Sequence, residues 1–169
     1  MATDVWVLPE PGRAGGSGKP TPVVAEIGIQ GQAQFSPDTR LVAYTSLETG
    51  APNIYVRSYS YANGAVRTGP KRLVSRSGGT NARWDNRRAK LFYLTTNVQL
   101  VSMDVDTRSG FEAGAPMPLF SFTDSGGALT NLMWAIDQHR QRFLFVSAPP
   151  TARTEPFTVV VNWESRIAK

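Results

Sequence analysis

The sequence repeats itself with a spacing of about 50 residues, and this repeat limits the folds that the chain can adopt. The stretches 33–46, 82–95 and 135–147 read AQFSPDTRLVAYTS, ARWDNRRAKLFYLT and AIDQHRQRFLFVS. The first two align without gaps, so that Phe35 meets Trp84 at an offset of 49 residues. A period of this length indicates a structural unit that stacks on copies of itself.

Short apolar runs predict that each unit consists of β-strands. The runs are rich in β-branched and aromatic residues and are bounded by Gly, Pro, Asn, Asp or Ser, which is typical of strands. No window of 11 or more residues has the apolar spacing of an amphipathic helix. We therefore expect an all-β chain with strands over 5–8, 41–44, 54–56, 91–94, 98–105, 143–146 and 157–161.

Several of these runs are apolar at consecutive positions, which predicts strands that are covered on both faces. Face-to-face stacking of antiparallel sheets provides such cover, and a period near 50 with about four strands per unit is typical of a β-propeller blade. Trp84 and Trp134 are then expected in the packing between blades. The predicted fold is a β-propeller portion of about three four-stranded antiparallel blades, which is half of a six-bladed ring. The expected units are the outer strands of one blade (1–28), two blades (29–77 and 78–127) and an incomplete blade (128–169).

The segment FSPDTRLVAYTSLETGAPNIYVRSY (35–59) resembles the repeat of TolB-like six-bladed propellers. The order of VWVLP, FSPD, NIYVR, VSRSGGTNARW, LFYL, FEAGAPMPLF, RFLFV and TVVVNW is similar to the C-terminal half of the propeller attached to many bacterial serine/threonine protein kinases. The chain has no kinase motif such as a Gly-rich loop, HRD or DFG. The resemblance therefore implies a propeller related to a receptor sensor region, and no kinase activity.

The chain departs from this pattern in its turns and in its number of strands. The Asp-Gly turn of the repeat reads Asp38-Thr39, Arg87-Arg88 and His139-Arg140 in the three copies. A different turn geometry is expected, or a cost of about 1 kcal/mol where φ must be positive. A half-ring exposes apolar blade faces and strand edges at both ends. This predicts either that two copies meet end to end or that a longer parent protein supplies the missing blades.

Composition argues against an enzyme. The chain has no cysteine and one histidine, His139, which excludes disulfides, thiolate zinc sites and multi-histidine metal sites. His139 has no serine in a G-x-S-x-G elbow to act on. The stretch 12–19 lacks the spacing of a phosphate loop, and Asp104 and Asp106 are expected at a solvated strand end. No catalytic residue, metal or cofactor is expected.

Neither a membrane span nor a secretory signal is visible, because no run approaches 18 apolar residues and the first residues lack a basic segment followed by an apolar one. The location of the chain therefore stays open from its residues alone. The resemblance suggests a periplasmic or extracytoplasmic place.

Five arginines form the candidate interaction site. The repeat places them at or beside the turn between the first two strands of successive blades, and turns in this position emerge on one face of a propeller. Guanidinium groups gathered there would attract an acidic partner, and the alternative is a solvated rim of balanced charge. Nucleic acid is not expected, because no Lys/Arg run with interleaved aromatics is present. The residues are Arg40, Arg87, Arg88, Arg140 and Arg142.

These features predict a non-catalytic scaffold that binds a protein or peptide partner and associates with itself through its open ends. Two alternatives stay open. The first is a propeller that supports a kinase or hydrolase domain encoded elsewhere. The second is a binder of small anionic ligands at the arginine face.

Overall fold

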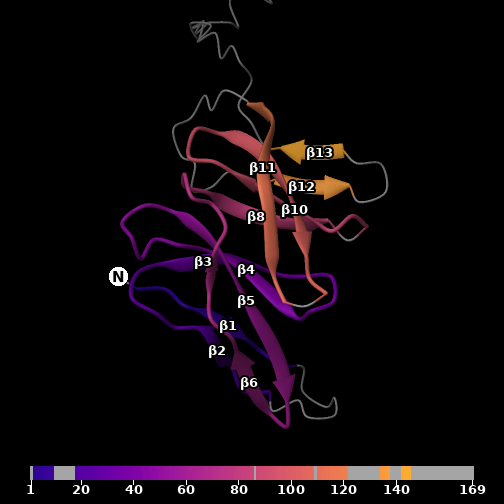
Figure 1. Ribbon diagram of the computed structural model, residues 1–169. Coiled ribbons are helices and arrows are strands. Elements are labelled where there is room, and N and C mark those ends of the chain that lie inside the picture. The colour runs from indigo at the N-terminus through magenta and orange to yellow at the C-terminus, as the bar shows by residue number, and fades with distance from the viewer. Residues whose placement is uncertain are drawn as a thin grey trace, which may run out of the picture.

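The computed structural model describes residues 2–9, 18–85, 87–108, 110–121, 134–137 and 142–145. Within these ranges the chain forms strands and turns, with no helix that could cross a membrane. The predicted all-β class is confirmed. In chain order (Figure 1) the strands are β1 (Val5–Val7), β2 (Thr21–Val24), β3 (Gln30–Phe35), β4 (Leu41–Ser46), β5 (Asn53–Ala62), β6 (Ala65–Thr68), β7 (Arg72–Leu73), β8 (Thr80–Asp85), β9 (Lys90–Leu94), β10 (Gln99–Asp106), β11 (Glu112–Ser121), β12 (Trp134–Asp137) and β13 (Arg142–Phe145).

The described strands form four antiparallel sheets that follow one another along the chain. The first sheet pairs β1 with β2, the second contains β3 to β7, the third has the order β11-β10-β9-β8, and the fourth pairs β12 with β13. Figure 1 shows them in succession from the indigo N-terminal strands to the orange strands. This all-β arrangement is that of part of a β-propeller, as the repeat predicts.

An apolar core fills the space between each pair of consecutive sheets. The side chains of each core come from both sheets, so a sheet without its neighbour would leave an apolar face in water. The core between the first and second sheets includes Val24, Val42, Tyr44 and Tyr55; the next includes Ala43, Ile54, Val56, Trp84, Leu91 and Tyr93; and the last includes Phe92, Leu94, Leu100 and Trp134.

The second strand of each large sheet is buried on both faces, as its run of apolar residues predicts. All six residues of β4 are buried, and Leu91–Leu94 of β9 are buried as well. Alternate residues serve different cores: Tyr44 packs toward the first sheet, whereas Ala43 packs toward the third. The repeated apolar runs therefore correspond to strands that pack against a sheet on each face.

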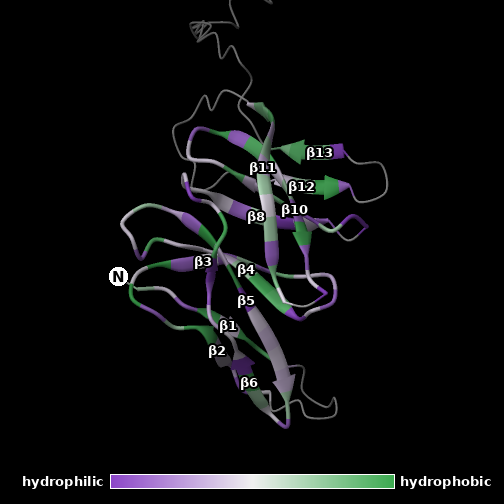
Figure 2. Ribbon diagram, viewed as in Figure 1, coloured by the Kyte–Doolittle hydropathy of each residue, from purple (hydrophilic) through white to green (hydrophobic). Residues whose placement is uncertain are grey.

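Two tryptophans connect the first strands of consecutive sheets. The indole Nε1–H of Trp84 in β8 donates a hydrogen bond to the carbonyl of Gln34 in β3, at 3.2 Å. The indole of Trp134 in β12 donates to the carbonyl of Asn81 in β8, at 3.1 Å. Both rings are buried, so the expectation that they pack between blades is confirmed. The largely hydrophobic β12 and β13 (green in Figure 2) complete the last core.

The second sheet departs from the expected four strands, because its outer position is shared between two short strands. β7 has two residues and pairs with β5 at Tyr55 and Val56. Beyond that point β5 continues into a hairpin with β6. Asn63 and Gly64 make its turn, with φ of 52° and 77°, which is the left-handed backbone that a two-residue hairpin turn requires. β7 therefore covers only a short part of the outer edge of this sheet.

Candidate interaction surfaces

The first predicted arginine, Arg40, is paired with an aspartate of its own turn. Its Nε donates to Oδ2 of Asp38 at 2.7 Å, and its backbone N–H donates to Oδ1 at 3.1 Å. The hydroxyl of Ser36 also donates to Asp38 Oδ1, at 2.7 Å. The hydrogen bond from Ser36 and those from Arg40 outweigh burial and lower the pKa of Asp38 to about 2. The turn thus presents an ion pair.

The second turn repeats this use of an aspartate. Oδ1 of the buried Asp85 accepts the backbone N–H groups of Arg87 at 2.8 Å and of Arg88 at 3.3 Å. Both arginines are exposed. The first and second turns lie side by side, because both line one pocket of about 230 Å³. This pocket is lined by Ser36, Pro37, Asp38, Trp84, Asp85, Arg87, Ala89, Lys90, Val105 and Thr107.

In the third hairpin, Arg142 is paired with Asp137. Its Nε and Nη2 donate to Oδ2 of Asp137, at 3.0 and 2.7 Å. Arg140 and His139 lie outside the described residues. The structure therefore brings the first two turns together and gives each described turn a carboxylate beside its arginines.

The aspartates are the residues that sequence reasoning missed at these turns. Asp38, Asp85 and Asp137 each lie within five residues of a predicted arginine, and this spacing is visible in the sequence. The prediction of the arginine surface rests on the positive charges alone. The resulting surface presents both signs of charge in close alternation.

A second group of charges lies between the first and second sheets. Glu26 accepts hydrogen bonds from Arg57 Nη2 at 2.5 Å and from Lys71 Nζ at 2.6 Å, and Lys71 also donates to Glu48. Burial opposes ionisation of Glu26, but these bonds outweigh it and lower the pKa of its carboxyl. The Arg57 guanidinium lies 5.8 Å from the ring centre of Tyr44, whose pKa burial raises to about 12. We interpret this group as a structural link between sheets, because each charge has a partner.

Exposed apolar side chains lie on the outer faces of the first and last described sheets. Trp6 of β1 is 55% exposed, and Leu144 of β13 is 70% exposed. The repeat aligns Trp6 with Tyr55, which is buried against the preceding sheet. Trp6 thus has the side chain of a blade core without a described neighbour to cover it.

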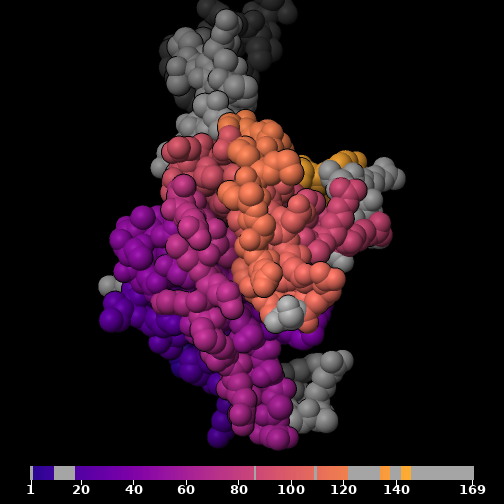
Figure 3. Space-filling model, viewed as in Figure 1, coloured from indigo at the N-terminus to yellow at the C-terminus, as the bar shows by residue number. Residues whose placement is uncertain are grey.

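Two hollows lie away from the arginine turns. A groove of about 870 Å³ runs between the segment around β7 and the beginning of β11. In Figure 3 the orange β11 runs beside the magenta segment that carries β7. A smaller apolar pocket of about 350 Å³ lies between the second and third sheets and is lined by Ile29, Gly31, Gln32, Thr45, Leu47, Pro52, Thr80 and Thr96.

The remaining sequence candidates lie at the end of β10 or, for the most part, outside the described residues. Asp104 is paired with Lys90 at 2.5 Å, and Asp106 with Arg108 at 2.5 Å, at the end of β10, so the interpretation of a solvated strand end is confirmed. Of the stretch 12–19, the part before Gly18 lies outside the described residues, as does 157–161. Within the described ranges no group of three or more His, Asp or Glu side chains could hold a metal ion.

Comparison with known proteins gives a partial similarity. A stretch of 58 residues is 41% identical to the Protein TolB homolog of Chlamydia muridarum (strain MoPn / Nigg) and, to the same extent, to those of Chlamydia trachomatis serovar D and serovar L2. This stretch is 34% of the present chain and 13% of each relative. No protein-family model matches the chain.

Proposed function

We propose that this chain is a segment of a β-propeller that binds a protein or peptide partner and carries out no catalysis. The observation that supports this proposal is the succession of three apolar cores, which fixes four sheets in one stack and leaves the turns at its rims exposed. The partial similarity to TolB homologs agrees with it. In this proposal 29–77 and 78–127 are blades, 1–28 is the outer part of a preceding blade, and 128–169 is an incomplete one.

The proposed contact surface is the row of arginine turns formed by Arg40, Arg87, Arg88, Arg140 and Arg142. Because Asp38 and Asp137 pair with two of these arginines, the surface suits a partner that offers both signs of charge better than a small anion does. Rim charges mainly affect the rate of association and its dependence on salt.

Selection of displayed random peptides on the immobilised chain tests the binding function. We expect sequence-specific enrichment, and we expect the quadruple variant with Arg40, Arg87, Arg88 and Arg142 changed to Ala to bind part of the enriched set more weakly. Absence of any enriched sequence would contradict the proposal that the chain is a binding scaffold. Enrichment that the quadruple variant leaves unchanged would contradict the arginine surface only.

We further propose that two copies associate through the faces that carry Trp6 and Leu144. A two-fold pair of half-rings would cover both faces at once. Light scattering on a size-exclusion column should then give about twice the chain mass of 18.4 kDa. Trp6→Ser combined with Leu144→Ser should shift the mass to the monomer, with Thr68→Ser as the control. A monomer at every concentration of the unmodified chain contradicts self-association.

We also propose a relation to the sensor region of bacterial receptor kinases, acting outside the cytoplasm. The order of motifs along the chain supports this relation. The DNA upstream of the Met1 codon tests it: an in-frame kinase domain supports the relation, and an in-frame stop codon contradicts it. A hydrolase domain there would favour a propeller that supports an enzyme.

A further inference from the structure

The groove beside β7 exists because the outer strand of the second sheet is short. β7 ends at Leu73, and the chain then turns at Ser75, whose carbonyl accepts the N–H of Gly78 at 3.4 Å. A full-length strand here would cover the face of the third sheet. Instead the floor of the groove includes Val74, Tyr93, Met103 and Phe111. These side chains belong to the core between the second and third sheets and are at most 6% exposed, so the floor is closed and the rim of the groove carries its exposed groups.

The opposite wall is the first half of β11, and this strand is bent by a bulge. Met103 pairs with Pro116 and Val105 with Ala113, so Gly114 and Ala115 together face Asp104. A Cβ on Gly114 would lie 3.3 Å from the Asp104 carbonyl oxygen, which favours glycine at this position. Bulges re-aim strands beside binding sites, and here the bulge lies on the groove.

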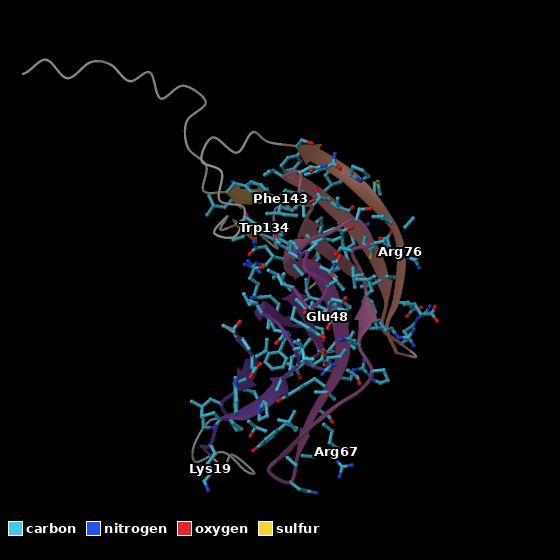
Figure 4. All side chains as sticks on the ribbon, turned by 90° about the vertical axis from the view of Figure 1, so that its left-hand side faces the viewer. Lys19, Glu48, Arg67, Arg76, Trp134 and Phe143 are labelled. Atoms are coloured by element: carbon cyan, nitrogen blue, oxygen red, sulfur yellow. The ribbon has the colours of Figure 1, made fainter. Side chains whose placement is uncertain are left out.

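Two arginines on one wall set the charge of the groove. Arg72 is the cross-strand partner of Val56 and therefore lies on the face of the second sheet that packs on the third. Arg76 lies in the turn after β7, beside the curved β11 (Figure 4). Within the part of the chain that the structure describes, neither side chain has an ion pair or hydrogen bond, unlike Arg40, Arg57, Arg108 and Arg142. Glu112 is the other charged residue of the described lining.

The outer edge of β11 offers backbone groups along the same groove. β11 is the last strand in the order of its sheet, so its outer edge pairs with no described strand. Pro116 and Pro118 remove donors from the later part of β11 and discourage strand addition there. The stretch 112–115 has no proline and lines the groove. Along the groove, an extended segment therefore meets a part of this edge whose backbone N–H groups are all present.

We propose that this groove binds an extended acidic peptide segment of a partner protein. Carboxylates of the peptide would pair with Arg72 and Arg76, and its backbone would run along 112–115 of β11. A volume of about 870 Å³ falls in the range of pockets that accept a drug-sized ligand. This inference rests on the proposed function as a binding scaffold, and it names the surface and the chemistry of the partner.

The test uses the full chain and peptides enriched from a random display library. Enriched peptides should carry at least two Asp or Glu. Fluorescence anisotropy should show that Arg72→Ala/Arg76→Ala weakens their binding at least tenfold, and that changing the peptide's Asp and Glu to Asn and Gln does the same. Arg67→Ala removes an exposed arginine at the far end of the β5–β6 hairpin (Figure 4) and should change binding less than twofold.

A steric variant tests the same groove without altering charge. Ala113→Trp places a large side chain on the exposed first half of β11 and should also weaken binding at least tenfold, with the melting temperature and circular dichroism confirming the fold. Enriched peptides that bind the Arg72→Ala/Arg76→Ala and Ala113→Trp variants as tightly as the unmodified chain would overturn the groove while leaving the scaffold function intact. Enriched peptides without acidic residues would overturn the acidic chemistry. Absence of any enriched peptide would contradict both proposals.

Discussion

The side chain of Gln32 accepts a hydrogen bond from the backbone N–H of Asn81, with 3.1 Å between Oε1 and N. The two residues lie 49 positions apart, at the same place in consecutive repeats. Both have left-handed backbones, with φ of 53° and 55°, and each lies within a register shift of its strand pair. The repeat is therefore visible in the backbone irregularities as well as in the core. Gln32, within the irregular part of the β3–β4 pair, forms a hydrogen bond to the next sheet.

Replacing Gln32 by leucine should destabilise this junction. The oxygen of Gln32 also accepts the hydroxyl of Thr45 at 2.7 Å, and Asn81 is buried, so Gln32→Leu leaves a buried N–H without its acceptor. We expect the free energy of unfolding to fall by about 2 kcal/mol in urea denaturation. Gln32→Glu retains an acceptor at this position and should lose less. Equal losses in the two variants would show that the hydrogen bond is not the cause.

Replacing Thr39 by glycine should stabilise the chain. Thr39 has φ of 59°, a left-handed backbone that costs a non-glycine residue about 1–2 kcal/mol. The extra flexibility of glycine in the unfolded chain costs about 0.5–1 kcal/mol. We expect Thr39→Gly to raise the free energy of unfolding by about 0.5–1 kcal/mol, measured by chemical denaturation. Thr68→Gly, in the exposed strand β6, should lower it, and a loss at position 39 as well would contradict this account.

Stability should depend on Asp38 at low pH. Its pKa is about 2 in the folded chain against 3.8 as the ordinary value, so its ionised form stabilises the fold fully above about pH 4. That contribution is lost as the pH falls toward 2. The difference in melting temperature between the unmodified chain and Asp38→Asn should therefore be constant above pH 4 and shrink between pH 4 and 2. Carboxyl NMR titration should show that Ser36→Ala raises the pKa of Asp38. A constant difference down to pH 2 would rule this contribution out.

Removing Lys71 should weaken the contact between the first two sheets. The change Lys71→Ala leaves the carboxylates of Glu26 and Glu48 without the ammonium group that they share. Because these groups are partly buried, we expect a loss of about 1–2 kcal/mol in the free energy of unfolding at low salt and a smaller loss in 1 M NaCl. Lys90→Ala is the matched control, because its partner Asp104 is mostly exposed, and it should have little effect. Similar losses in both variants would contradict the role of burial.

The repeat predicted the core well, because core positions recur with the blade. Tyr44 and Tyr93 lie at equivalent positions and are both buried against the preceding sheet, and Trp84 is buried at the position of Phe35. Phe35 itself is 44% exposed, since the strands before it supply less cover than the second sheet supplies for Trp84. Periodicity thus predicts which face a residue takes, and the neighbouring sheet decides how deeply it is buried.

The candidate surfaces were harder to predict, because they depend on departures from the repeat. The repeat located the arginine turns, but the pairing of Arg40 with Asp38 follows from local turn geometry. The groove beside Arg72 and Arg76 depends on a two-residue β7 and on a bulge in β11. The hydropathy pattern predicts neither feature. The length of β7 depends on where β5 leaves it to form the hairpin with β6.

The three cores have a consequence for how the molecule comes apart. Each core joins only neighbouring sheets, so mechanical load applied to the two ends of the stack passes through the junctions in series. The weakest junction gives way first, whatever the strength of the others. Extension in an optical trap would then proceed in separate steps, one for each junction, including the central one around Trp84 and Tyr93.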